Sequence, residues 1–329
     1  MDALFDKLKE EESIKEVLIS SKFYSSSLEN LNFNSFSDLN VFDGDVSSVW
    51  IDGGNSEIFG SPSYSYQKVR VVGIFWCGKS SVLTRKLDVE CFIDSDLKIV
   101  VESDDELVKS VVGILNSSEL VANVGQVKTP GDMVDILRRC LEIRLLNVMM
   151  NEGDVCFGVL DGNLIASTNY EETLLKGLVG KNVFAVSKSS NIATTGMSIF
   201  SELDKRANIK GDVGSWFVED VLVPKSNFIF GKVLFSKLHK KSKLILKIDY
   251  LGGDDFINNL GEIERLSKDP VFLGYPYPLV KVDQLARVSN EEIEFFKTKI
   301  LVRAKEKGLK LESEDLQKSG HSILDSIRF

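Results

Sequence analysis

Histidine is the scarcest catalytic residue type in this sequence, since His239 and His321 are the only two among 329 residues. An HExxH zinc site is therefore excluded, because it needs two histidines one helical turn apart. Two histidines also leave few candidates for the base of a Ser-His-Asp triad. Any catalysis is expected to depend on carboxylates, lysines and metal ions.

Cysteine and long apolar runs are also scarce. None of the four cysteines forms a CxxC pair; they are Cys77, Cys91, Cys140 and Cys156. Because all four lie in apolar runs, we predict small core residues in a reducing compartment, the cytoplasm. No apolar run reaches about 18 residues, and the N-terminus is too acidic for a signal peptide, so no membrane association is expected.

Positive charge is in short supply, because the formal net charge is −9. A uniformly acidic surface repels a polyanion. Binding of nucleic acid would therefore need a local basic patch, or a partner protein that supplies much of the affinity. The hydrophobic fraction of 43% and the charged fraction of 27% are ordinary for a globular protein.

The order of apolar patterns predicts an α/β fold. Strands are expected at 49–51, 64–77, 82–93, 155–160 and 182–187, a hairpin at 233–238 and 244–248, an extended segment at 274–282, and helices at 104–115, 130–149, 171–178 and 290–307. Such an order would suit an RNase H-like mixed sheet flanked by helices, with inserted hairpins and an N-terminal helix within residues 1–30. We predict an N-terminal helical segment (1–45), one main domain (46–290) and a C-terminal helix and tail (291–329).

The segment from Gly73 to Ser80 matches the phosphate-binding pattern GxxxxGK[ST]. A functional loop of this kind must be followed by a helix whose N-terminus faces the anion. Here the residues between the glycines are bulky and apolar, and those that follow are β-branched. We therefore predict a hairpin turn.

Two apolar strands run into Asp-Gly, at Asp52-Gly53 and Asp161-Gly162. An aspartate at a strand end is held rigidly, and the glycine permits a close approach to a ligand. Oxygen ligands of this kind suit Mg²⁺ and Mn²⁺. The alternative is that each Asp-Gly is simply a turn.

Glu142 lies at the edge of an apolar helical face just before the Asp161 strand. From that position its carboxylate could lean towards Asp161. The alternative, which residue spacing alone favours, is an ion pair with Arg138 or Arg139, four and three residues earlier.

Together these segments resemble the NurA nuclease family. The matching segments are IDGG with Asp52, RRCLEIRLL with Glu142, VLDGNL with Asp161, AVSKS with Lys188, KLH with Lys237 and His239, and GYPYPLVKVD with Tyr275 and Asp283. The resemblance covers roughly residues 45–290, and the order of the segments is more specific than any one of them.

The resemblance implies an RNase H-like fold and a DNA nuclease that uses Mn²⁺ or Mg²⁺. It implies 5′ to 3′ exonuclease and single-strand endonuclease activity in DNA end resection and repair, a homodimer, and a HerA-type hexameric ATPase as partner. Carried over, Asp52, Glu142, Asp161 and Asp283 become the metal ligands, Tyr275 lies at the site and Lys188 contacts a phosphate. This chain departs from many relatives at Asp283, where they carry histidine.

A lysine-rich hairpin could supply the local basic patch. It contains Lys232, Lys237, His239, Lys240, Lys241, Lys243 and Lys247. These side chains could follow a phosphate backbone, or they could form a solvated turn.

Two other functions fit the same pattern. The chain could be a non-catalytic RNase H-like subunit that binds DNA or a motor protein. It could also be a phosphotransferase of the actin-like kinase type, for which only residues 251–254 approach the required glycine-rich segment.

Overall fold

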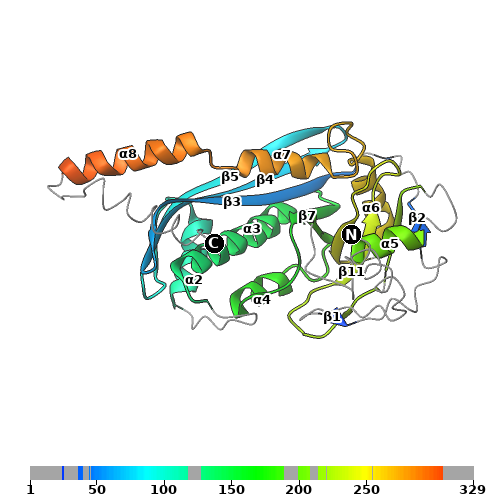
Figure 1. Cartoon of the computed structure of the whole chain (residues 1–329), viewed down its shortest axis with the longest axis horizontal. Coiled ribbons are helices and arrows are strands. Elements are labelled where there is room, and N and C mark those ends of the chain that lie inside the picture. Colours follow the sequence, from blue (N-terminus) through cyan, green and yellow to red (C-terminus); the bar gives the residue numbers. More distant parts are fainter. Residues whose placement is uncertain are drawn as a thin grey trace, which may run out of the picture.

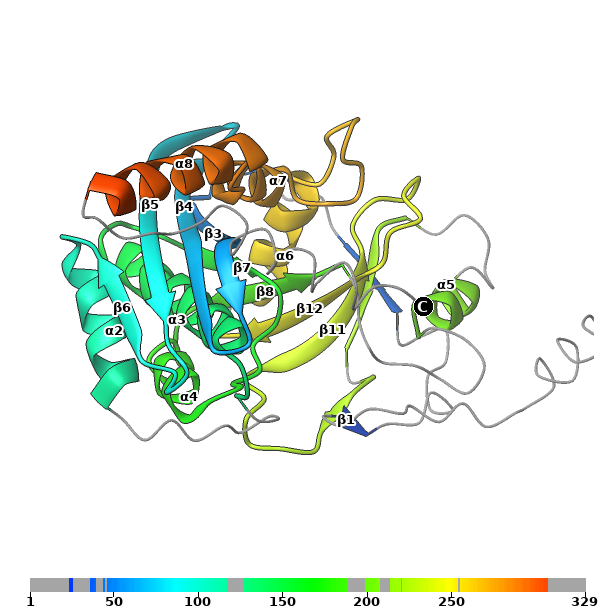
Figure 2. The same ribbon diagram turned by 60° about the vertical axis from the view of Figure 1, so that its left-hand side comes forward.

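A mixed sheet organises the protein. The computed structural model describes residues 24–25, 36–39, 44, 46–117, 127–188, 199–207, 214–219, 221–253 and 255–306. Within these ranges ten strands form one sheet in the order β2-β9-β11-β12-β8-β7-β3-β4-β5-β6 (Figures 1 and 2). Their bounds are β2 Phe36–Asp38, β3 Ser48–Ser61, β4 Tyr64–Cys77, β5 Ser80–Ile93, β6 Ile99–Glu102, β7 Phe157–Asp161, β8 Val183–Ser187, β9 Trp216–Val218, β11 Lys232–Lys237 and β12 Leu246–Leu251.

Strands β3, β7 and β8 are parallel, and the other pairs in this sheet are antiparallel. Two short strands, β1 (Tyr24–Ser25) and β10 (Val223–Pro224), pair separately. This arrangement confirms the predicted RNase H-like mixed sheet flanked by helices.

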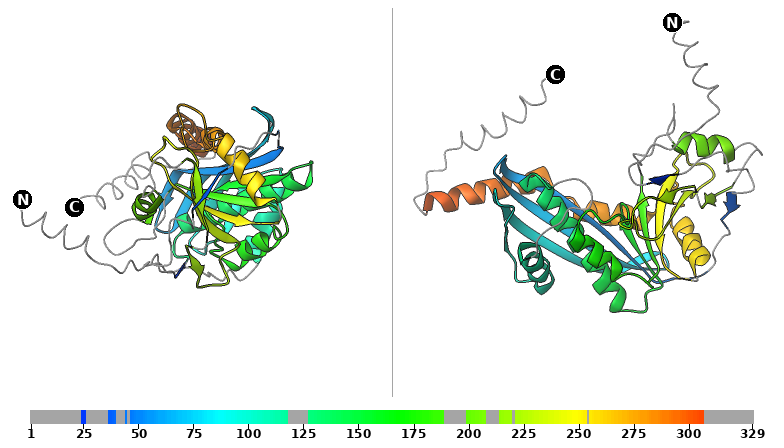
Figure 3. Two further views of the ribbon diagram at one scale, coloured as in Figure 1. Left: turned by 90° about the vertical axis from the view of Figure 1, so that its right-hand side faces the viewer. Right: turned by 90° about the horizontal axis from the view of Figure 1, so that it is seen from below.

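Helices cover both faces of the sheet (Figures 1 and 3). They are α2 Glu106–Ser117, α3 Pro130–Asn151, α4 Asn169–Lys176, α5 Ile199–Ala207, α6 Phe256–Arg265, α7 Tyr277–Ala286 and α8 Asn290–Glu306. Helices α2, α3 and α4 bury their apolar residues with Val49 and Ile51 on what we call the α3 face. Helices α6 and α7 pack with Trp50 on the opposite α7 face, since successive strand residues alternate between faces.

Helix α3 is the longest described helix, and its start is well encoded. Thr129 and Asp132 form a capping box, and Pro130 occupies the first turn, where a missing N–H costs nothing. The first turn is thereby fixed over the sheet. The position of this first turn sets which side chains of α3 face the sheet.

Two local predictions were wrong. The Asp52-Gly53-Gly54 segment does not turn: β3 runs through it and pairs with β4 as far as Ser61. The segment from residue 274 is not extended throughout, because α7 begins at Tyr277. Prolines at the cap and in the first turn start this helix, because neither position needs an N–H for an intrahelical hydrogen bond.

The segment that matches GxxxxGK[ST] forms the β4–β5 hairpin, as predicted: Gly78 has a φ of 61°, and β5 begins at Ser80.

Of the four cysteines, Cys91 and Cys140 are buried as predicted, whereas Cys77 and Cys156 are exposed because they lie at sheet ends. The predicted N-terminal helix lies outside the described residues, except that Tyr24–Ser25 is a strand. No helix in the described part is long and apolar enough to cross a bilayer.

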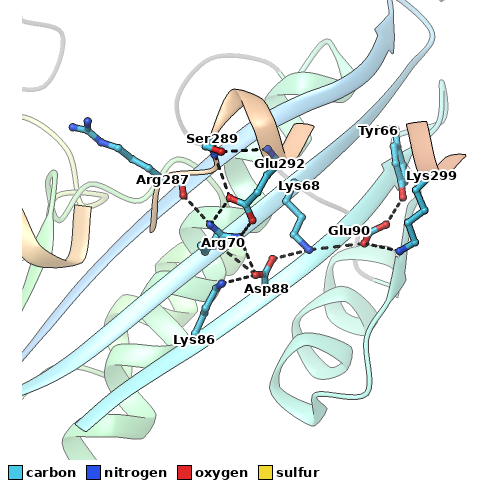
Figure 4. A network of polar contacts seen from close by, with 10 residues as sticks. All are labelled: Tyr66, Lys68, Arg70, Lys86, Asp88, Glu90, Arg287, Ser289, Glu292 and Lys299. Atoms are coloured by element: carbon cyan, nitrogen blue, oxygen red, sulfur yellow. Dashed lines mark hydrogen bonds and ion pairs between the residues drawn. The ribbon is translucent and has the colours of Figure 1, made fainter. Parts of the chain in front are cut away.

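Charged contacts attach α8 to the sheet (Figure 4). Arg70 of β4 bonds Asp88 on β5, Glu292 on α8 and the carbonyl oxygen of Arg287 between α7 and α8. The Lys68 ammonium lies 4.7 Å from the centre of the Phe296 ring. Since the Lys68 and Arg70 side chains are 8% and 7% exposed, these pairs hold the α7–α8 connection firmly over β4.

Candidate active site

Parallel pairing places Asp52 beside Asp161. In the β3–β7 ladder Ile51 is the partner of Leu160, so the next residues of the two strands are the two aspartates. Ile51 and Leu160 both belong to the core of the α3 face. By strand alternation Asp52 and Asp161 point to the α7 face.

The sheet opens at this point, because β7 ends at Asp161 while β3 continues to Ser61. Beyond it, β4 is the one described strand that pairs with β3. Two glycines follow Asp52, and other segments of the same chain approach both of them closely. A Cβ on Gly53 would lie 2.5 Å from Oε1 of Glu142, and one on Gly54 would lie 2.7 Å from the carbonyl oxygen of Ala286.

Tyr275 and Lys188 converge on Asp161. The Tyr275 hydroxyl donates to Oδ2 of Asp161 at 3.1 Å. The Lys188 ammonium lies 3.6 Å from the same oxygen and 4.4 Å from the centre of the Tyr275 ring. The segment before α7 and the end of β8 thus meet over the β7 aspartate. Burial and Asp161 raise the pKa of Tyr275 above its usual range, so its hydroxyl keeps its proton.

The charge of Asp283, on α7, contributes to raising the pKa values of both Asp52 and Tyr275. It also forms an ion pair of 2.6 Å with Arg287, one turn later. Because Arg287 is 73% exposed, this pair is weakly held.

Glu142 reaches the site from the α3 face and is buried, with a side chain only 2% exposed. Of the two alternatives set out from the sequence, the ion pair with Arg138 and Arg139 occurs. Glu142 accepts from Arg138 and, at 3.2 Å, from Arg139, and its charge still raises the pKa of Asp52. Asp161, Glu142 and Asp283 all influence the charge of Asp52, and we call these four residues an electrostatic cluster.

The environment of Asp52 strongly favours its protonated form. Its pKa rises to about 7, first because of burial and then because of Asp161 and Glu142, with a smaller effect of Asp283. The opposing influence is the Gly53 amide, which donates to Oδ1 of Asp52 at 2.7 Å. Mutually repelling carboxylates around a partly buried acid form a donor set that a hard divalent cation would stabilise.

In the described ranges, no three histidine, cysteine, aspartate or glutamate side chains already stand together as ligands of one ion. The oxygens of Asp161, Asp283 and Glu142 are instead directed towards Lys188, Arg287 and the two arginines. The oxygen-only chemistry of the set still fits Mg²⁺ or Mn²⁺. Binding would require these ion pairs to rearrange.

The lysine-rich hairpin divides into two parts. Lys240, Lys241 and Lys243 are exposed in the loop between β11 and β12. This loop borders the Tyr275 segment, because a Cβ on Gly274 would lie 2.4 Å from Oγ of Ser242 and 3.8 Å from Cβ of His239. It therefore adjoins the carboxylate cluster.

The strand lysines of this hairpin differ from those of the loop. Lys237 is buried and lies 3.1 Å from Asp204, and Lys247 is buried in an ion pair with Asp249. The idea that Lys237 and Lys247 follow a phosphate backbone is not supported by these positions, because each ammonium already has a buried or partly buried partner.

Sequence reasoning did not assign Arg138 and Arg139 to the site, although it paired them with Glu142. Arg138 also donates to the carbonyl oxygen of Gly53 at 3.3 Å, and Arg139 donates to that of Asn163. The spacing of the three residues on one helical face was the available signal. The contacts of Arg138 with strand β3 and of Arg139 with the loop after β7 leave no comparable trace in the sequence.

Without metal, the stability of the protein should depend on pH through Asp52. Its pKa is near 4 in an unfolded chain and about 7 in the folded one. The folded state therefore binds more protons between these values, and the free energy of unfolding should fall as pH rises through this window. Urea unfolding at pH 5 and pH 8 in chelator measures this, and Asp52→Asn should reduce the fall. An equally large fall in that variant would contradict the assignment.

Comparisons with known proteins give the fold an independent reference. No family model and no curated sequence matches the chain. Among solved structures, the NurA nuclease from Sulfolobus solfataricus superposes with a TM-score of 0.52 at 15% identity, covering 94% of this chain and 95% of the other. A second NurA structure gives a TM-score of 0.50 at 11% identity, covering 88% and 93%. This chain therefore has the fold of the NurA nuclease structures over most of its length.

Proposed function

We propose that this chain is a divalent-metal-dependent deoxyribonuclease. One observation carries the proposal: Asp52 and Asp161 stand side by side at the point where β7 ends, with Glu142 and Asp283 in the same electrostatic cluster. Its fold, shared with nuclease structures, supports the assignment. Following the family resemblance, the proposed activities are 5′ to 3′ exonuclease and single-strand endonuclease cleavage in DNA end resection and repair.

Asp52, Asp161, Asp283 and Glu142 would hold Mn²⁺ or Mg²⁺. Such ions activate water and stabilise the leaving oxygen in phosphodiester hydrolysis. Asp52 lies on the strand next to the one that bears Asp161, and its pKa is raised by all three other carboxylates, so we treat it as the central carboxylate. Many relatives carry histidine at position 283. With aspartate there, all four proposed ligands are hard oxygen donors.

The remaining side chains would orient the DNA. Tyr275 holds Asp161 through its hydroxyl and packs under Lys188. The Lys188 ammonium is about half exposed, so it can exchange its contact with Asp161 for a phosphate oxygen. Lys240, Lys241 and His239 would extend this positive edge along the strand.

The experiment is digestion of end-labelled single-stranded and duplex DNA with Mn²⁺, with Mg²⁺ or with chelator, using Asp52→Asn as the matched inactive control. Products of the proposed reaction carry 5′ phosphates. Metal-independent cleavage, or cleavage that survives Asp52→Asn, would contradict the proposal.

A second candidate is a non-catalytic subunit that binds DNA or a motor protein. The arginine pairing of Glu142 favours it, because that carboxylate is already neutralised. Calorimetry with Mn²⁺ separates the two functions: no measurable binding together with intact DNA binding would favour the second. The proposed partners, a second copy of this chain and a HerA-type hexameric ATPase, rest on the resemblance and are compatible with either function.

Replacing Lys240, Lys241 and Lys243 together by alanine should weaken binding of single-stranded DNA, whatever its sequence. Each lysine that contacts a phosphate contributes about 0.7 to the slope of log K against log salt, so the slope should fall by roughly 2. Fluorescence anisotropy at several salt concentrations measures this. The matched control replaces Lys98, Lys109 and Lys176, which lie in the β5–β6 loop and on α2 and α4. Equal losses in both variants would indicate a nonspecific effect of net charge.

A further inference from the structure

Each of the two central aspartates is followed by a glycine, and each glycine lies near an arginine of α3. A Cβ on Gly53 would lie 3.0 Å from Cγ of Arg138. At Gly162, whose φ is +114°, the nearest side-chain atom to such a Cβ is Nη1 of Arg139, at 4.0 Å. Both Asp-Gly pairs therefore lie beside an arginine of α3.

Both arginines connect α3 to the backbone just after an aspartate. Arg138 donates to the carbonyl oxygen of Gly53, one residue after Asp52, at 3.3 Å. Arg139 donates to the carbonyl oxygen of Asn163, two residues after Asp161. These contacts cross 85 and 24 residues of sequence.

Glu142 joins the two arginines. Its Oε1 accepts from Arg138 and its Oε2 accepts from Arg139, so each carboxylate oxygen holds one guanidinium. The carboxylate side chain is 2% exposed, and the arginine side chains are 26% and 15% exposed. Burial makes these charge-assisted bonds strong and expensive to break, so the three side chains form a stiff unit.

The Asp161 loop is fixed on its other side as well. The Gly162 amide donates to the carbonyl oxygen of Val186, and the Leu164 amide donates to Oδ2 of Asp249, both at 2.9 Å. These bonds tie the loop to β8 and β12. Arg139, through Glu142 and Arg138, adds a side-chain link between this loop and the Asp52 segment beyond the last pair of the β3–β7 ladder.

We infer that Arg138 and Arg139 are positioning residues, which hold Asp52 and Asp161 at a fixed separation just beyond the end of the β3–β7 ladder through their shared bridge on Glu142. The inference rests on the proposed function and deepens it. If the arginines only neutralised Glu142, they would not need to contact the carbonyl oxygens of Gly53 and Asn163. The forked guanidinium explains the arrangement, since it can donate to a carboxylate and to a carbonyl at the same time, which an ammonium on a flexible stem does less well.

The test keeps the charge and removes the fork, in Arg138→Lys, Arg139→Lys and the double variant. We expect the dissociation constant for Mn²⁺, measured by electron paramagnetic resonance on the full chain, to rise about tenfold in each single variant. The Mn²⁺ concentration needed for half-maximal cleavage should rise in parallel. Arg144→Lys is the matched control, because this residue lies on the same helix but outside the bridge; it should bind Mn²⁺ as the wild type does.

Glutamine variants separate positioning from charge. If the arginines only compete with the metal for the carboxylates, Arg138→Gln and Arg139→Gln should bind Mn²⁺ more tightly than the wild type; positioning predicts weaker binding. Tighter binding in the glutamine variants, or wild-type behaviour in the lysine variants, would overturn the inference alone. A wild-type protein that neither binds Mn²⁺ nor cleaves DNA would overturn the proposed function and the inference with it.

Discussion

Asp52→Asn should lower kcat for DNA cleavage by at least about a hundredfold. Losing a hydrogen-bond partner of a metal ligand typically costs about 10–100-fold, and losing the central ligand should exceed that. The amide is nearly isosteric with the carboxyl group but cannot carry its charge. Steady-state digestion of end-labelled single-stranded DNA at saturating Mn²⁺ measures the effect.

The fold should survive this change. Burial and three neighbouring carboxylates raise the pKa of Asp52, so its ionised form is destabilising in the metal-free protein. Removing the charge should leave the free energy of unfolding at pH 8 unchanged or higher. Asp96→Asn, in the exposed β5–β6 loop, is the control for a lost carboxylate and should cleave normally. Unfolding of Asp52→Asn, or cleavage at the wild-type rate, would refute the role given to Asp52.

Gly54→Ala should impair both stability and cleavage. The added Cβ would lie 2.7 Å from the carbonyl oxygen of Ala286 and 3.8 Å from Cα of Arg287, so it meets backbone and not a movable side-chain end. Overpacking of this kind costs about 1–3 kcal/mol. Either β3 or the end of α7 must shift, and these carry Asp52 and Asp283. A displacement of about 1 Å can cost about a hundredfold in rate.

The control is Gly113→Ala on α2, where an added Cβ has nothing within 4 Å. There alanine should raise the free energy of unfolding by about 0.5–1 kcal/mol, because glycine is a poor helix former. Urea unfolding and Mn²⁺-dependent digestion, run on both variants, separate the two effects. If Gly54→Ala matched the wild type in both measurements, the close approach of α7 to β3 would not be needed for the site.

Local sequence signals sufficed where one signal dominated. The capping box at Thr129 with Pro130 marks the start of α3, and the β-branched run after Lys79 marks a hairpin and not a phosphate loop. They failed where pairing with a neighbouring strand overrides the local conformational preference of the residues. Gly53 and Gly54 favour a turn, yet β3 continues because β4 pairs with it residue by residue.

The sequence by itself determined which functional groups are available as metal ligands. With two histidines and no CxxC pair, it left carboxylates as the available metal ligands, and the ordered segments around Asp52, Glu142, Asp161 and Asp283 indicated which ones. Their convergence in one cluster was a prediction of the resemblance, since periodicity reports which face a residue occupies but not which distant residue it meets.

Only the tertiary structure decided how Asp52 is surrounded. Parallel pairing brings Asp161 beside it, and α7 and α3 supply Asp283 and the arginine-paired Glu142, whose charges act on its pKa. The physical reason is that a carboxylate's pKa, its ion pairs and its access to a metal depend on charges and burial supplied by segments far away in the chain. Those distances are set by packing, which no local pattern records.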